Sequence, residues 1–216
     1  MLLRCDQRAW GQRFLGPDER AFRLPFPMNK SPLEIDRETG LLSGSVCLCS
    51  PHCDDRPDGV AIDAMVIHAI SLPPGYFETE AISDFFLGCL DADAHPYFKE
   101  IATLKVSAHF LIDREGRIIQ FVPVIRRAWH AGNSSLTGRA RVNDFSVGIE
   151  LVGSDDTWFT NRQYATLTSL TEALQFAWPT ITAERIVGHS DIAPGRKSDP
   201  GPHFDWARFR ESIASG

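Results

Sequence analysis

The strongest structural signal in the chain is AMVIH at residues 64–68, a short apolar run bounded by loop-forming residues. A run of this length predicts a buried β-strand, here one that ends at His68. FSVGIEL at residues 145–151 is a second apolar run and predicts an inner strand. ERIVGH at residues 184–189 predicts a third strand, which ends at His189. Two histidines therefore stand at the ends of predicted strands.

Helical patterns and one hairpin lie around these strands. The clearest helix is predicted at residues 161–178, where apolar side chains recur every three to four residues and Thr160 with Gln163 makes a capping box. Further helices are predicted at residues 78–90, 95–104 and 205–214. HFLI and RIIQFV flank DREG, which predicts a hairpin because Gly116 can adopt the positive φ of such a turn. This order of elements predicts an α/β fold with a central mixed β-sheet flanked by helices.

Length and composition suit a single domain with an extra arm, since the chain has 216 residues and 43% of them are hydrophobic. Residues 1–40 contain several prolines and no sustained hydrophobic period, so we assign them to an N-terminal arm of unknown role and residues 41–216 to the main domain. A net charge of −6 and the absence of a long Lys/Arg run argue against nucleic acid as a partner. No obligate protein partner is indicated either.

The expected location is the cytoplasm, away from membranes. No segment reaches the roughly 18 apolar residues of a membrane span, and the N-terminal residues lack the apolar core of a secretory signal. The five cysteines are an odd number, and Cys47, Cys49 and Cys53 crowd into CLCSPHC, which fits a reducing compartment better than a disulfide framework. With His52, this segment offers four ligands that are too close together in sequence to surround a tetrahedral ion without strain.

A metal site is the main chemical hypothesis. If the strands that end at His68 and His189 are parallel neighbours, the two imidazoles converge on one ion. The loop GHSDIAPGRKSDPG at residues 188–201 adds a carboxylate from either Asp191 or Asp199, and spacing alone does not choose between them. Two neutral histidines and one carboxylate leave a divalent ion with an open position, which is the arrangement of a hydrolytic zinc centre. The alternative is that each histidine is a hydrogen-bonded core residue.

Two further residues are candidates for catalysis. Glu150 lies inside the second apolar run and is the candidate general base, because a buried carboxylate needs a metal, a water molecule or a cation to compensate it. Strand alternation equally allows this side chain to face solvent. Lys197 is the candidate partner for a developing oxyanion, although a loop lysine is more often solvated.

A substrate-binding group is predicted around the hairpin. His109 begins the hairpin and His130 follows it, so both side chains are expected on one face. Trp129 and His130 are a candidate platform for a sugar, whereas a tryptophan packed in the core is the commoner outcome. Lys105 completes the candidate substrate-binding residues.

Five motifs identify a family resemblance. The chain contains, in this order, VIHAISLPPG, LKVSAHFLID, RAWHAGNSS, NDFSVGIELVG and GHSDIAPGRKSDPGPHFDWARF. Together they closely resemble the AmpD-type N-acetylmuramoyl-L-alanine amidases, from about residue 47 to residue 210. The resemblance implies a single-domain fold similar to that of phage-lysozyme amidases and peptidoglycan recognition proteins, with one zinc ion.

The resemblance also implies roles for individual residues. It assigns the zinc ligands to His68, His189 and Asp199, so that the choice against Asp191 rests on alignment. It assigns the acid/base role to Glu150 and transition-state stabilisation to Lys197. The implied substrates are 1,6-anhydro-muropeptides, cleaved at the amide between the muramic lactyl group and L-alanine during cell-wall recycling.

The sequence departs from the family pattern beside the first ligand. Ala69 follows His68 where the family has an asparagine, so a side-chain hydrogen bond to the muropeptide is expected to be missing. The rival hypothesis is a binding module, because some relatives of this fold recognise peptidoglycan without cutting it. Loss of a zinc ligand would mark such a module, and none is missing here.

Overall fold

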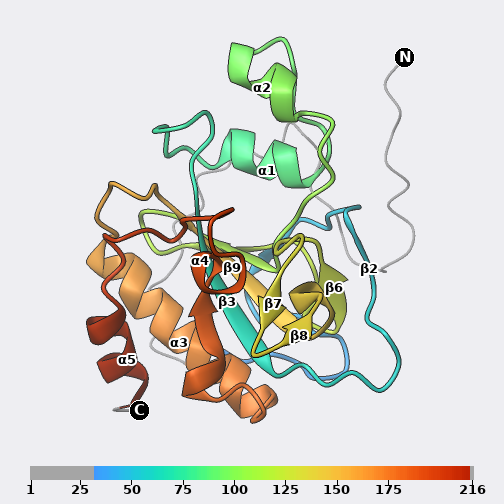
Figure 1. Ribbon diagram of the computed structural model, residues 1–216, viewed down its shortest axis with the longest axis vertical. Coiled ribbons are helices and arrows are strands. Elements are labelled where there is room, and N and C mark those ends of the chain that lie inside the picture. Colours follow the sequence, from blue (N-terminus) through green and yellow to red (C-terminus); the bar gives the residue numbers. More distant parts are fainter. Residues whose placement is uncertain (1–31, 215–216) are drawn as a thin grey trace. The chain divides into compact units, whose positions relative to one another are not determined.

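The computed structural model describes residues 32–214 and is built on a six-stranded mixed β-sheet (Figure 1). In spatial order the strands are β1 (Val46–Cys47), β5 (Ile118–Gln120), β4 (Phe110–Ile112), β9 (Ser146–Val152), β3 (Ala64–Ile70) and β10 (Ile186–Gly188). Only the β4–β5 pair is antiparallel in this sheet. The predicted mixed sheet is confirmed, and β3 and β10 are the parallel neighbours that the metal-site hypothesis requires.

The predicted strand at residues 64–68 is longer than expected. Ala69 and Ile70 continue the pairing with β9, so β3 runs two residues beyond His68. The predicted hairpin is confirmed: β4 and β5 pair across residues 113–117, and Gly116 has a φ of 79°.

Five α-helices and two short 3-10 helices accompany the sheet in the described residues. They are α1 (Glu80–Phe86), α2 (Pro96–Ile101), η2 (Val142–Asp144), α3 (Asn161–Ala177), η3 (Ala183–Arg185), α4 (His189–Ile192) and α5 (Trp206–Ala214). The capping box of α3 is confirmed, because Thr160 and Gln163 each accept the other's backbone N–H through their side chains. α1 is shorter than predicted, and Gly88 adopts a left-handed φ of 70° just after it.

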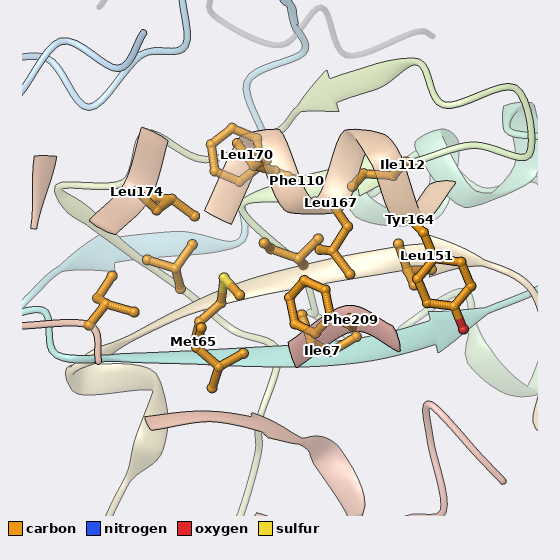
Figure 2. Close-up of a cluster of buried hydrophobic side chains, with 14 of the residues drawn as sticks. Met65, Ile67, Phe110, Ile112, Leu151, Tyr164, Leu167, Leu170, Leu174 and Phe209 are labelled. Carbon is orange, nitrogen blue, oxygen red and sulfur yellow. The ribbon is translucent and has the colours of Figure 1, made fainter. Parts of the chain in front are cut away.

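The main core lies between the sheet and α3. Figure 2 shows Met65 and Ile67 of β3 and Leu151 of β9 facing Leu167 and Leu170 of the helix. These side chains are almost completely buried. Burial of one large aliphatic side chain stabilises a fold by about 1.5–3 kcal/mol, so this layer fixes which face of β3 and β9 is turned inward.

α5 packs beside α3, as Figure 1 shows, and its start matches the sequence prediction. Asp205 is the N-terminal cap, because its Oδ1 accepts the Arg208 N–H at 3.0 Å. Phe204 and Phe209 lie on either side of this cap with ring centroids 5.8 Å apart, as expected for a hydrophobic staple.

The opposite face of the sheet is covered in part by α1 and α2. Phe85 and Phe86 of α1 and Phe98 of α2 share a second buried cluster with Leu111 of β4. Two small antiparallel sheets are formed by β2 (Cys53–Asp55) with β6 (Arg126–Ala128) and by β7 (Ser135–Leu136) with β8 (Arg139–Ala140). Ala128 of β6 belongs to the second cluster, whereas Leu136 of β7 belongs to a third cluster with Val66 of β3. Neither layer covers the adjoining ends of β3 and β9 completely, since Ile70 and Glu150 are only partly buried.

Residues 32–40 belong to the same compact unit as the sheet. The Gly40 carbonyl accepts the Val124 N–H at 2.9 Å and the Gln120 side-chain amide at 2.8 Å. The predicted boundary at residue 40 thus falls inside this unit, and residues 1–31 of the predicted arm lie outside the described residues. Among the described residues, no helix has the length and apolar character needed to cross a membrane.

Candidate metal centre

The candidate site lies on the sheet face opposite α3. Ile67 of β3 points toward α3, so the alternation of side chains along a strand turns His68 to the other face. In β9, Ile149 and Leu151 belong to the core under α3, and Glu150 is turned away from it in the same manner. His68 and Glu150 are register partners in adjacent parallel strands, so their side chains emerge side by side.

Three metal-ligating atoms converge beside Glu150. The Nδ1 atoms of His68 and His189 are 3.0 Å apart, and each lies 3.1 Å from Oδ2 of Asp199. Both histidines are buried and Asp199 is partly buried. In the part of the chain that the structure describes, these residues are the one group of three whose donor atoms lie close enough to share an ion.

His189 lies near the start of the loop at residues 188–201. It was predicted as the end of a strand, but β10 ends at Gly188 and His189 is the first residue of the one-turn helix α4. The turn starts there because Asp191 Oδ2 accepts the Gly188 N–H at 2.7 Å. Asp191 is therefore used as a helix cap. The Ser190 N–H donates to the Asp199 carbonyl at 2.9 Å and holds that residue against the turn.

The three donor atoms fit a divalent metal of the zinc type. Zinc–nitrogen and zinc–oxygen bonds of about 2.0–2.1 Å in a tetrahedron separate adjacent donors by about 3.3 Å, close to the spacings of 3.0–3.1 Å found here. His189 Nε2 lies 3.3 Å from the Ala131 carbonyl, so a proton on Nε2 can donate to this oxygen and leave the lone pair of Nδ1 for the ion. Two imidazoles and one carboxylate occupy three positions and leave a fourth open.

Glu150 combines burial with an unmatched oxygen. Its Oε2 is inaccessible to solvent and has no hydrogen-bond partner among the described residues. Burial raises the pKa of Glu150 well above its usual value, the charge of Asp199 raises it further, and the charge of Lys197 lowers it. A carboxyl group with a raised pKa beside a metal site can both accept and return a proton near neutral pH.

Burial disfavours the charged form of two histidines at the site, His68 and His130. Burial lowers the pKa of His68 to about 4, although the carboxylate of Asp199 opposes the shift. Burial also lowers the pKa of His130 well below its usual value, and the neighbouring His68 and His109 lower it further. Neutral imidazole is the form that binds a metal.

The two basic residues of the loop are placed differently. Lys197 is exposed, and its charge acts on both Glu150 and His68. Arg196 donates from Nη2 to the carbonyls of Ala131 and Asn133 at 2.7 and 2.8 Å, and thereby links the loop to the segment after Trp129.

His109 lies inside the protein rather than on an accessible surface. It is fully buried, its Nδ1 accepts the Gly148 N–H at 3.0 Å, and its Nε2 lies 3.0 Å from the Arg126 carbonyl. Arg56 also approaches Nε2, at 3.1 Å. Because both ring nitrogens have partners within the fold, the contacts favour a structural role for His109 over the predicted role in substrate binding.

The other candidate substrate-binding residues, Trp129, Lys105 and His130, differ in their surroundings. Trp129 is partly buried, donates from Nε1 to Asp54 at 3.0 Å and stacks on His52. Lys105 is exposed on the segment between α2 and β4. His130 alone among the four contacts a donor residue of the metal group, since its Nδ1 lies 2.9 Å from Nε2 of His68.

Gly148, Ser146 and Arg196 are parts of this site that the sequence analysis missed. Gly148 carried a readable signal, because a glycine inside a strand often marks the close approach of another group. A Cβ atom at this position would lie 2.4 Å from Cγ of His130.

The structure also shows where Ala69, the departure from the family pattern, lies: this residue packs against the core under α3, on the face opposite His68. This position argues that a side chain at residue 69 would face the core rather than the substrate.

A comparison with known families gives a clear result. The sequence profile of the N-acetylmuramoyl-L-alanine amidases matches residues 58–202. The chain belongs to this family. The match spans all the donor residues and Glu150.

Individual relatives are similar over most of the chain. The 1,6-anhydro-N-acetylmuramyl-L-alanine amidase AmpD of Escherichia coli K12 is 54% identical over 177 residues, which are 82% of this chain and 96% of that protein. AmpD of Haemophilus influenzae is 51% identical, over 82% of this chain and 97% of that protein.

Solved structures agree with this family and fold. The crystal structure of an AmpD derivative has a TM-score of 0.80 and 51% identity, over 83% of this chain and 98% of that chain. AmpDh3 of Pseudomonas aeruginosa in complex with anhydromuramic pentapeptide is more distant, with 32% identity and a TM-score of 0.52, over 72% of this chain and 61% of that one.

Proposed function

We propose that this protein is a zinc-dependent amidase that hydrolyses the bond between 1,6-anhydro-N-acetylmuramic acid and L-alanine in muropeptides during cell-wall recycling. The observation that carries the proposal is the convergence of three ligand atoms beside Glu150, whose Oε2 is buried. Identity of 50–54% to AmpD proteins along most of the chain supports the choice of substrate. The complex of AmpDh3 with an anhydromuramic pentapeptide shows that another protein of similar fold binds such a ligand.

His68 and His189, through Nδ1, and Asp199, through Oδ2, would hold the zinc ion. A bound zinc ion supplies Lewis acidity, which makes water nucleophilic at neutral pH and polarises the carbonyl of the scissile amide. The protein contributes rigidity, since His68 lies on a central strand and the other two ligands are linked by the Ser190–Asp199 backbone hydrogen bond.

Glu150 would move the proton. Its raised pKa allows the ionised carboxylate to take a proton from the attacking water and the resulting acid to give it to the departing nitrogen. This second step is needed because an amine anion is too poor a leaving group at neutral pH. The new C–O bond forms first, and the C–N bond breaks when the nitrogen receives this proton. The products are the carboxylic acid of the muramic lactyl group and the amine of L-alanine, which ionise at neutral pH to a carboxylate and an ammonium group.

Lys197 would stabilise the charge that develops on the carbonyl oxygen. It lies on the same loop as Asp199, it is exposed, and its charge is felt by Glu150. A cation at this position favours the transition state over the neutral amide, which is the condition for lowering the barrier.

The decisive test incubates the zinc-loaded protein with purified anhydro-muropeptides and, separately, with intact sacculi, and identifies released peptides by mass. Release of peptides that begin with L-alanine from anhydro-muropeptides is the expected result, with Glu150→Gln as an inactive control. If the zinc-loaded protein binds muropeptides but releases peptide from neither material, the amidase hypothesis is wrong and the protein is a peptidoglycan-binding module. The cytoplasmic location remains part of the proposal and is tested by fractionation of the producing cells.

A further inference from the structure

A chain of hydrogen bonds leads from the metal donors into the protein. Nε2 of His68 lies 2.9 Å from Nδ1 of His130, and Nε2 of His130 lies 3.2 Å from Oγ of Ser146. The Ser146 hydroxyl is 2.7 Å from the carbonyl oxygen of Val142. Ser146 and Val142 are fully buried, so water does not compete at the inner end of the chain.

The inner end of this chain fixes its direction. Ser146 Oγ lies closer to the Val142 carbonyl than to Nε2 of His130, and because a carbonyl can only accept, the hydroxyl donates its single proton to it. Ser146 Oγ must then accept toward His130, which places the proton of the neutral His130 ring on Nε2. Nδ1 of His130 is left with a lone pair and accepts the Nε2–H of His68. With its proton on Nε2, His68 turns the lone pair of Nδ1 toward His189 and Asp199, which is the arrangement that a metal held by these donors requires.

The ring of His130 is held from two sides. The backbone N–H groups of His130 and Ala131 both donate to Oδ1 of Asn143, at 3.2 and 2.8 Å. The ring lies directly over Gly148, where any Cβ would approach it to 2.4 Å. It meets the ring of His68 edge to face, with centroids 5.1 Å apart. This support sets the position of the acceptor atom as well as its identity.

We propose that His130 is a positioning residue that orients His68 for metal binding, by accepting its Nε2–H and holding its lone pair on Nδ1. The inference rests on the proposed function, because it concerns the metal centre of that reaction. It gives His130 a task distinct from the predicted contact with a sugar. Hydrogen-bonded partners of metal-binding histidines contribute about 10- to 100-fold to metal affinity in other proteins, which sets the expected size of the effect.

The first test measures zinc affinity of the full chain by competition with a chromophoric chelator. His130→Ala is expected to weaken binding by about 10- to 100-fold, and His130→Asn to recover most of the loss, because its Oδ1 can accept at the position of the lost Nδ1. His52→Ala is the matched control: this buried histidine lies within hydrogen-bond distance of the Val106 carbonyl and is not part of the hydrogen-bonded series from His68 to Val142. It is expected to leave zinc affinity unchanged.

The second test reads the tautomer without any substitution. In zinc-loaded wild-type protein, ¹⁵N NMR of the imidazole groups is expected to show His68 protonated at Nε2 and His130 protonated at Nε2. A proton on Nδ1 of His68, or equal zinc affinity in wild type and His130→Ala, overturns the inference. Either result leaves amidase activity of the wild type intact, whereas a zinc-loaded wild type without amidase activity refutes the proposed function.

Discussion

Replacing Glu150 by glutamine should stabilise the zinc-free protein against unfolding. The same substitution should sharply lower the turnover of the zinc-loaded protein. The substitution keeps the shape of the side chain and removes a negative charge whose Oε2 is buried and has no partner among the described residues. Function requires that charge, because the carboxylate takes the proton from water. In the absence of metal, this charge without a partner destabilises the folded protein.

The size of the stabilisation follows from the hydrogen-bond environment. Leaving a charged group without a partner costs more than leaving a neutral one, by about 1–2 kcal/mol. A protein of 150–250 residues gains about 2–4 °C in Tm for each kcal/mol. The expected gain for Glu150→Gln is therefore about 2–8 °C at pH 7–8.

The raised pKa of Glu150 also predicts how the stability difference between variant and wild type changes with pH. The folded-state pKa of Glu150 is raised above its unfolded value of about 4.3, so the folded protein holds this proton more tightly than the unfolded chain. The contribution of protonated Glu150 to the free energy of unfolding is fully present below about pH 4.3 and is lost as pH rises through the folded-state pKa. Glutamine does not titrate, so the difference in Tm between variant and wild type should widen from pH 5 to pH 8.

The assay is thermal unfolding of both proteins in excess chelator at several pH values, with turnover measured separately after zinc loading. Turnover of Glu150→Gln should fall by at least about 100-fold, the usual scale for loss of a general acid/base group, while zinc content stays near that of wild type. A difference in Tm that does not change with pH, or a variant less stable at every pH, would show that Glu150 has a partner in solution and refute the reasoning.

Four further substitutions test other parts of the site. Asp199→Ala should lose zinc in metal analysis, whereas Asp191→Ala should keep it and lose about 1 kcal/mol of stability through its helix cap; the opposite order would transfer the ligand role. Gly148→Ala should lower the free energy of unfolding by about 1–3 kcal/mol in denaturant titrations, because its Cβ would meet the ring of His130, and an unchanged value would mean that this ring is not packed there. Lys197→Ala should retain zinc but lower kcat by about 100- to 1000-fold, and normal turnover would exclude its contact with the oxyanion.

Local patterns in the sequence determined the elements and the list of reactive residues. The apolar run at residues 64–68, the capping box at Thr160 and Gln163 and the glycine turn at Gly116 each depend on neighbours a few residues away. Such signals can be read without the fold because a strand period, a helix cap and a turn are local properties of the backbone. The family motifs then added the expected chemistry.

Only the tertiary structure decided which reactive groups meet. The parallel pairing of β3 with β10 brings His68 to His189, which are distant in sequence, and the loop makes Asp191 a cap while Asp199 joins the donors. The face that Glu150 occupies, left open by the sequence, follows from packing under α3. The same packing buries His109 and makes His130 the neighbour of His68. These outcomes depend on register and on contacts between distant segments, which the local sequence pattern does not encode.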